Sequence, residues 1–453
     1  MSHTRVAPET NKQALRVEQA LRLLPDVEDL APLRGFVMSR ASSRAMDGWM
    51  GAEPNRTIGK RTLDSTALRN GVPNVLSRVT RRVAVLYDAA VEALESEQNG
   101  DMSQAVRALV RAGEHEERGV RHSQARAWYR QALGIAEQLR DRRPEMETLC
   151  HLGRLEAARG YVDEGARAFQ RSLALAEAES DQEHAAAACQ GLGNVVLAQA
   201  KWTGAEAWFN RGLRFAAATP AIAGGLFLGL GETALRRAQP DVAATHLARA
   251  LECFEAVGDE AGIIRALLAR GRMEAKQGAS AEALASYRQA LTRLAVAHAA
   301  GQGDGAGDPL LELSVRLRLA ELYLDLGRIR EAEDEARRTE DLAITHDLPS
   351  TLALVYMIMG KLRGRQGDET GFVFFEQAIE LCRTGDPARR LEADVYAEYA
   401  RFRLAMGDRS EARAYLERAR ELVEPFGDEV ARQRIDDELR QLVAAGATGV
   451  AEG

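Results

Sequence analysis

Residues 152–177 read LGRLEAARGYVDEGARAFQRSLALAE, and this stretch decides the fold because its pattern returns along most of the chain. In this stretch the small residue Gly153 follows Leu152, and a turn comes about seven residues later. After the turn, a small residue is followed four positions later by a large one, and three positions after that by another small one. Related stretches read ARGRMEAKQGASAEALASYRQALTRL at 269–294, LAELYLDLGRIREAEDEARRTEDL at 319–342 and YARFRLAMGDRSEARAYLERARELVE at 399–424. Such repetition indicates stacked supersecondary units. With 453 residues, the chain is too long for one ordinary compact core, and a solenoid avoids this limit.

The small residue in the first helix of each unit sets the period. It falls at eight positions, and the intervals between them are 40, 40, 38, 40, 49, 40 and 40. The long interval contains the run AAGQGDGAGDP at 299–309, which reads as a flexible Gly-rich insertion. The eight positions are Gly113, Gly153, Gly193, Gly231, Gly271, Ala320, Gly360 and Ala400.

A small-to-large pairing is predicted between the two helices of each unit. The second helix carries a small residue at Ala125, Gly165, Ala205, Ala243, Ala283, Ala332 and Ala412. One turn later on the same face comes a large side chain, which fills the seam between the helices. The seventh unit is one residue shorter, and Ala336 departs from the pattern in the sixth. The large residues are Tyr129, Phe169, Phe209, Leu247, Tyr287, Phe375 and Leu416.

Glycines at 160, 327, 367 and 407 are predicted to end the first helix of their units. Helices suit the composition, since the hydrophobic fraction is 46% but aromatics make up only 5% and there are only 12 prolines.

These residues resemble the tetratricopeptide repeat family. The ~40-residue period exceeds the usual ~34 and is similar to a long-helix subgroup that includes kinesin light chains and the repeat domains of bacterial regulators. The resemblance covers roughly residues 102–424. It implies an all-α fold, an α-solenoid of about eight helix pairs in a right-handed superhelix, with an irregular helical N-terminal region.

The chain therefore divides into six expected parts. A helical, partly disordered region at 1–100 reads either as a small domain or as an arm folded over the array. The expected parts after it are repeats one to five at 101–298, the insertion at 299–309, repeats six to eight at 310–425, a capping helix at 426–443 and a disordered tail at 444–453.

The net charge of −7 argues against general nucleic-acid affinity. Residues 30–82 are locally basic, with ten Arg or Lys against three Asp or Glu. This stretch could contact nucleic acid or an acidic protein, but we favour an arm that docks on the acidic array. The N-terminus has no apolar segment of signal-peptide type, and no window resembles a membrane span, so we expect a cytoplasmic protein without membrane insertion.

No cofactor, metal site or catalytic group is predicted. The four cysteines form no CxxC pair and read as core residues, and the eight histidines fall at unrelated repeat positions. The glycines near 301 lack the strand and the GK[ST] of a phosphate loop, and no nucleophile elbow or carboxylate pair occurs. An enzyme is therefore the least favoured reading.

The resemblance implies that the first helices line a concave groove. It places in that groove the residue after the central small one and those three or four further on. Asn194, within LGNVV, resembles the asparagine that holds peptide backbone in related repeats. The alternation of cations with Glu232 and Glu321 argues against a simple phosphate or carboxylate clamp, and a solvated face without a ligand is the alternative. The candidates are Arg154, Asn194, Glu232, Arg236, Arg272, Lys276, Glu321, Lys361, Arg365 and Arg401.

Together these features predict an interaction scaffold that binds a partner protein or an acidic or extended peptide along the groove, where arginines suit carboxylates. The alternative is a regulatory protein that senses an effector or peptide and uses residues 1–100 as its output. No helix-turn-helix is recognisable in those residues. The sequence leaves the partner and the oligomeric state open.

Overall fold

The computed structural model describes residues 85–449, except 87–88, 91, 94, 98, 119–120, 300–308, 347, 384–388 and 427–428. The predicted basic stretch at 30–82 and almost all of the Gly-rich insertion lie outside the described residues. Contacts divide the chain into two compact units, Met1–Thr148 and Leu149–Gly453. This division falls inside helix α7.

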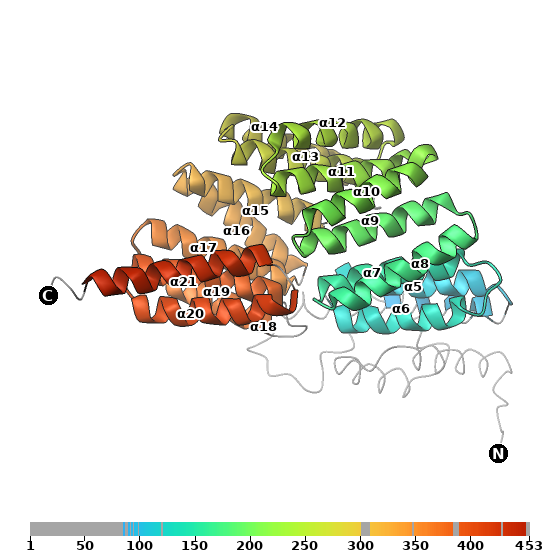
Figure 1. The fold of residues 1–453 in the computed structure, drawn as a ribbon, viewed down its shortest axis with the longest axis horizontal. Helices are drawn as coiled ribbons and strands as arrows, with labels where there is room; N and C mark the ends of the chain where they lie inside the picture. Colours follow the sequence, from blue (N-terminus) through green and yellow to red (C-terminus); the bar gives the residue numbers. More distant parts are fainter. Residues whose placement is uncertain are drawn as a thin grey trace, which may run out of the picture. The chain divides into compact units, whose positions relative to one another are not determined.

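Helices account for all regular structure in the described residues, and they form eight consecutive pairs, as predicted (Figure 1). The first pair, in the first unit, is α5 (Met102–Arg118) with α6 (His122–Ala136). The later pairs are α7 (Arg143–Ala158) with α8 (Val162–Ala178), α9 (Gln182–Ala198) with α10 (Trp202–Phe215), α11 (Pro220–Arg236) with α12 (Pro240–Val257), α13 (Glu260–Lys276) with α14 (Ser280–Ala299), α15 (Pro309–Asp325) with α16 (Ile329–Thr345), α17 (Pro349–Arg365) with α18 (Gly371–Arg383), and α19 (Arg389–Ala405) with α20 (Arg409–Val423).

The predicted seam between the helices of a pair is present. A Cβ added to Gly360 would lie 2.6 Å from Cε2 of Phe375, and one added to Gly153 would lie 2.9 Å from Phe169. Only a glycine leaves room for a ring this close to the helix backbone. In the sixth pair, Ala320 stands at the central small position and Ala336 at the position of the large residue. The larger side chain on the first helix is thus offset by the smaller one on the second, and both alanines are fully buried.

The turns that end the first helices need a left-handed backbone. Gly160, Gly327, Gly367 and Gly407 all have φ between +69° and +90°, as predicted. Gly278 does the same in the fifth pair and was not among the predicted glycines. In the third and fourth pairs this role falls to Ala200 (φ 59°) and Ala238 (φ 55°), which tolerate the conformation less well.

Within the second unit, the first helices of neighbouring pairs contact one another directly: α9 with α11, α11 with α13, α13 with α15, α15 with α17, and α17 with α19. Contacts between the second helices of neighbouring pairs are sparse among the described residues. A stack whose one layer is in closer contact curves toward that layer. The first helices therefore form the concave side of this unit.

The C-terminal helix α21 begins at Glu429 and ends at Gly449, so the predicted cap at 426–443 starts too early and ends too soon. Residues 424–426 form a short 3-10 turn instead. The residues at 444, 445 and 447 are alanines, the best helix formers, which explains why the helix continues into the predicted tail. The buried Ile435 and the packed Leu439 join α21 to the core of the last two pairs.

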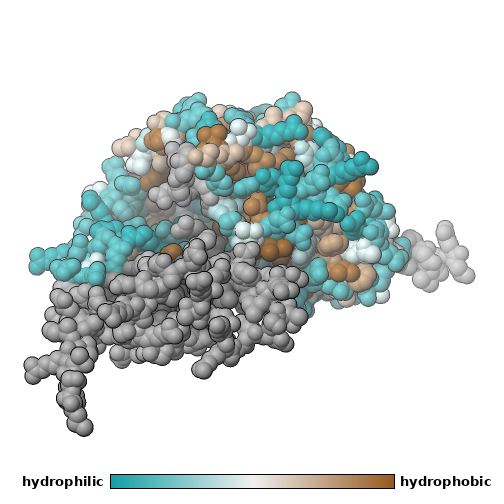
Figure 2. Space-filling view, turned by 180° about the vertical axis from the view of Figure 1, so that it is seen from behind, coloured by the Kyte–Doolittle hydropathy of each residue, from teal (hydrophilic) through white to brown (hydrophobic). Residues whose placement is uncertain are grey.

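Where the described residues are visible from the other side, their surface is mainly hydrophilic, with apolar residues in separate patches (Figure 2). None of the described helices combines the length and apolar character that crossing a bilayer requires.

The seam predicts that Gly360→Ala will destabilise the protein by about 1–3 kcal/mol, the usual cost of overpacking, although alanine is the better helix former. Phe375 cannot move aside easily, because its ring stacks on Tyr399 with 5.0 Å between centroids. Urea unfolding of the full chain measures the effect. Adding Phe375→Leu should recover part of the stability that the alanine removed, and a second loss on top of the first would contradict this packing.

Candidate functional site

All ten candidate residues lie on first helices of the second unit, and none of them is buried. We call the solvent-facing surface of helices α7, α9, α11, α13, α15, α17 and α19 the inner face. Its charged row consists of the polar and charged side chains at two places on each helix, the residue after the central small residue and the residue four further on, which share one side of the helix. The described second helices contribute none of these residues.

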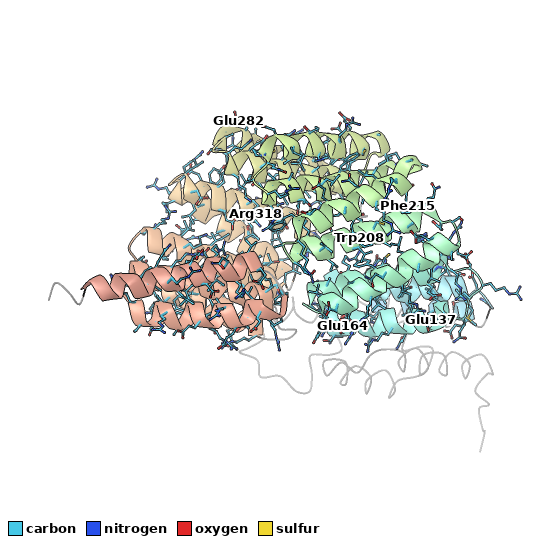
Figure 3. The ribbon with its side chains drawn as sticks, viewed as in Figure 1. Glu137, Glu164, Trp208, Phe215, Glu282 and Arg318 are labelled. Carbon is cyan, nitrogen blue, oxygen red and sulfur yellow. The ribbon has the colours of Figure 1, made fainter. Side chains whose placement is uncertain are left out.

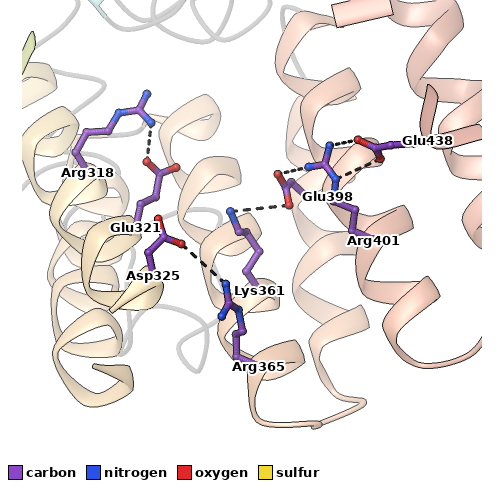
Figure 4. Close-up of polar contacts among 8 residues, drawn as sticks. All are labelled: Arg318, Glu321, Asp325, Lys361, Arg365, Glu398, Arg401 and Glu438. Atoms are coloured by element: carbon purple, nitrogen blue, oxygen red, sulfur yellow. Dashed lines mark hydrogen bonds and ion pairs between the residues drawn. The ribbon is translucent and has the colours of Figure 1, made fainter. Parts of the chain in front are cut away.

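Much of the charged row is already paired between neighbouring repeats. Nη2 of Arg272 lies 2.6 Å from Oε1 of Glu232, exactly one 40-residue period earlier on α11. Further along, Arg365 faces Asp325 at 4.0 Å and Lys361 faces Glu398 at 3.9 Å (Figure 4). Each exposed pair contributes at most about 1 kcal/mol. These candidates therefore take part in repeat-to-repeat contacts, whether or not they also meet a ligand.

Arg401 is the most strongly engaged of the ten. It donates one hydrogen bond of 2.6 Å to Glu398 on its own helix and another of 2.6 Å to Glu438 on α21 (Figure 4). Burial acts to lower the pKa of Arg401, but the hydrogen bond to Glu438 and the charges of both carboxylates outweigh it and raise that pKa. Arg401 thus ties the C-terminal helix to the last repeat. The sequence reading did not identify Glu438, because the cap follows no repeat register.

The two acidic candidates are each neutralised by an arginine. Glu232 is held by Arg272, and Glu321 accepts a 2.6 Å hydrogen bond from Arg318 on the same helix. Arg318, which extends from α15 in Figure 3, was not among the predicted residues. The alternation of cations with Glu232 and Glu321 argued against carboxylate binding. That argument no longer holds, because an arginine neutralises each of these two acids.

Asn194, Arg236 and Lys276 differ from the rest of the charged row. All three are exposed. Arg236 and Lys276 have no carboxylate within 4.0 Å among the described residues, and the amide of Asn194 has no hydrogen-bond partner there. Arg154 is not in this group, because its Nη2 lies 3.0 Å from Nδ1 of His151.

Large apolar side chains lie beside the charged row, one turn earlier, on helices α11, α13, α15 and α17. Leu228 and Leu268 are half-buried and pack against the core from the inner face, whereas Leu317 and Met357 are buried. The sequence reading missed these side chains, although the i, i+4 relation to the charged residues was available as a signal. The inner face therefore offers apolar contact next to polar groups.

The cysteines and metal-binding groups add little chemistry. Cys189 and Cys382 are buried as expected, and burial raises the pKa of Cys189 to about 11. Cys150 and Cys253 are only partly buried, contrary to the expectation that all four belong to the core. Within the part of the chain that the structure describes, no three His, Cys, Asp or Glu side chains are grouped as metal ligands.

Known structures support the fold. The Rap protein complexed with Competence and Sporulation Factor has a TM-score of 0.50 and 11% identity, covering 95% of this chain and 99% of that one. The apo quorum sensor NprR from B. thuringiensis has a TM-score of 0.47 and 15% identity, covering 78% and 95%. A tetratricopeptide repeat protein from Parabacteroides merdae has a TM-score of 0.38 and 15% identity, covering 68% and 97%.

No protein-family model matches the chain, and no curated protein matches it. At identities of 11–15%, the similarity to solved structures concerns the fold alone. The repeat register, the glycine-to-ring seams and the similarity to the Rap protein agree that the chain has the α-solenoid fold of tetratricopeptide repeat proteins.

The pairing on the inner face predicts different effects for two arginines. Arg401→Gln should cost about 1–3 kcal/mol, because it leaves Glu438 without its charged donor in a partly buried site. Hydrogen exchange of the amides in residues 429–442 should accelerate as α21 loses its anchor. Arg365→Gln is the matched control, since its ion pair is long and exposed, and it should cost less than about 0.5 kcal/mol. Equal effects of the two substitutions would show that Arg401 does not anchor α21.

Proposed function

We propose that the chain is an interaction scaffold, not an enzyme, and that its inner face binds an extended segment of a partner protein or a peptide. The observation that carries this proposal is the combination of two features. The side chains of Asn194, Arg236 and Lys276 make no hydrogen bond or ion pair with the described residues, and Leu228 and Leu268 beside them are half-buried. A surface of this kind gives a bound segment apolar contact and polar groups that fix its position.

Charged residues elsewhere on the inner face support the scaffold role in another way. Glu232–Arg272, Asp325–Arg365 and Lys361–Glu398 each join one repeat to the next. Such pairs favour a fixed spacing between repeats, so that the surface offered to a segment is already formed. Preorganisation lowers the entropic cost of binding. Ordering the segment still costs free energy, and we expect affinity in roughly the micromolar range.

The Rap protein of similar fold was solved as a complex with Competence and Sporulation Factor. For this chain, sensing of an effector or peptide with residues 1–100 as the output is the alternative proposal. Those residues lie mostly outside the described part, and this alternative stays a prediction.

The choice of test residue follows from the pairing. Charge reversal at Arg272, Lys361 or Arg401 would place a carboxylate against Glu232, Glu398 or Glu438, so a loss of binding there would also report lost stability. Asn194 avoids this problem because it is exposed and makes no hydrogen bond within the described residues. Asn210, exposed on the second helix α10, offers the same substitution away from the inner face.

Asn194→Ala should weaken retention of peptides from a degenerate dodecapeptide library on the immobilised full chain by about five- to tenfold, the value of one or two hydrogen bonds. Asn210→Ala should leave retention unchanged. Quantitative mass spectrometry of the retained peptides, with circular dichroism to confirm folding, makes the comparison. Equal retention by the two variants would remove the inner face as the binding surface, and retention no greater than on bare matrix would reject peptide binding.

A further inference from the structure

The turn that ends helix α7 differs from the equivalent turns of the array in what lies over it. In five pairs of the second unit, a glycine with positive φ ends the first helix. Four of these glycines are exposed, and a Cβ added to any of them would meet no described heavy atom within 4 Å. At Gly160, which is only partly exposed, a Cβ would lie 2.7 Å from Cε1 and 3.0 Å from Cζ of Phe426. The four open glycines are Gly278, Gly327, Gly367 and Gly407.

Gly160 and Phe426 belong to opposite ends of the second unit. Gly160 lies between α7 and α8, whereas Phe426 ends the short 3-10 turn at 424–426 that follows α20. Five complete helix pairs, from α9 to α18, come between them in the chain. The contact therefore joins the first and last pairs of a stack whose first helices form the concave side.

Core packing does not account for the position of Phe426. The hydrophobic core that joins the last two pairs to α21 includes Ile435 and Leu439 but not Phe426, and no residue of the turn at 424–426 is buried. The ring is instead half-exposed, with one edge against the backbone of Gly160. A half-buried ring of this kind stabilises a contact only modestly, so the contact can open without unfolding of the pairs that it joins.

We propose that the contact between Gly160 and Phe426 is a clasp that joins the two ends of the array and slows the release of a segment bound on the inner face. The holding role rests on the proposed function. Curvature of the stack sets the distances between equivalent residues on neighbouring first helices. A stack with joined ends keeps these distances, whereas a stack with free ends can widen and lose contacts with the segment.

Two turns with the same backbone hydrogen bond allow the clasp to be tested without a ligand. The N–H of Tyr161 donates to the carbonyl of Glu156 at 2.9 Å, and the N–H of Asp368 donates to the carbonyl of Arg363 at 2.9 Å. These are equivalent bonds in the second and seventh pairs. Only the first of the two turns has the Phe426 ring over its glycine.

Phe426→Ala should lower the hydrogen-exchange protection of residues 160–161 by about fivefold, as expected for the loss of a half-buried ring. Protection of residues 367–368 should not change, because their turn is open in the wild type. Mass spectrometry of peptic fragments from the full chain measures both. Phe372→Ala is the matched control, since Phe372 is 37% exposed at the start of α18, and it should leave residues 160–161 unaffected.

Unchanged protection of residues 160–161 in Phe426→Ala would overturn the clasp. A similar loss at both turns, or the same loss in Phe372→Ala, would overturn it as well, because either result reports a general loss of stability.

The holding role is tested by the dissociation rates of individual dodecapeptides retained on the immobilised full chain. Phe426→Ala should raise these rates by about fivefold, in step with the exchange result, and Phe372→Ala should change them by less than about twofold. Faster exchange at residues 160–161 with unchanged dissociation rates would overturn the holding role but leave peptide binding intact. If the wild type retains no peptide, the proposed function and the holding role both fail, and hydrogen exchange still decides whether the clasp closes.

Discussion

The close approach of two helices at a glycine is the constraint on which the rest of the structure depends. At Gly360, as at Gly153, a ring from the second helix lies where a Cβ would otherwise be. This contact fixes the distance and the rotation of the helices in the pairs that have it, and Ala320 with Ala336 takes its place in the sixth pair. Repetition of the same contact makes the pairs alike, so that they stack with a constant step and bring their first helices together on one side.

That stacking creates the inner face and also determines what it contains. Residues at one repeat position come side by side from helices 40 residues apart in the chain, as Glu232 and Arg272 do. Most charges brought together in this way neutralise one another and reinforce the stack. Arg236 and Lys276 are brought together by the same geometry but have the same sign, so that they are a local exception to the pairing that stabilises the array.

The sequence predicted the seam, the period and the helix pairs because these depend on residue size at fixed spacing, and spacing is visible in one dimension. Which residues face a ligand was inferred from the resemblance to tetratricopeptide repeats, and that assignment stays a prediction. The sequence did not predict the partners of these residues. Glu438 meets Arg401 from a helix outside the repeat register, and Arg318 neutralises Glu321 from a position that the register does not mark. Helix α21 ends later than expected because alanine continues a helix where a tail of small residues suggested disorder.

The central claim is that a segment lies along the first helices of the second unit, and site-specific photo-cross-linking tests it most directly. A benzoylphenylalanine placed at position 194 on α9 should cross-link to a peptide retained by the full chain, and the same probe at position 210 on α10 should not. Cross-links from position 210 with none from position 194 would contradict the account, since they would place the ligand on the second helices.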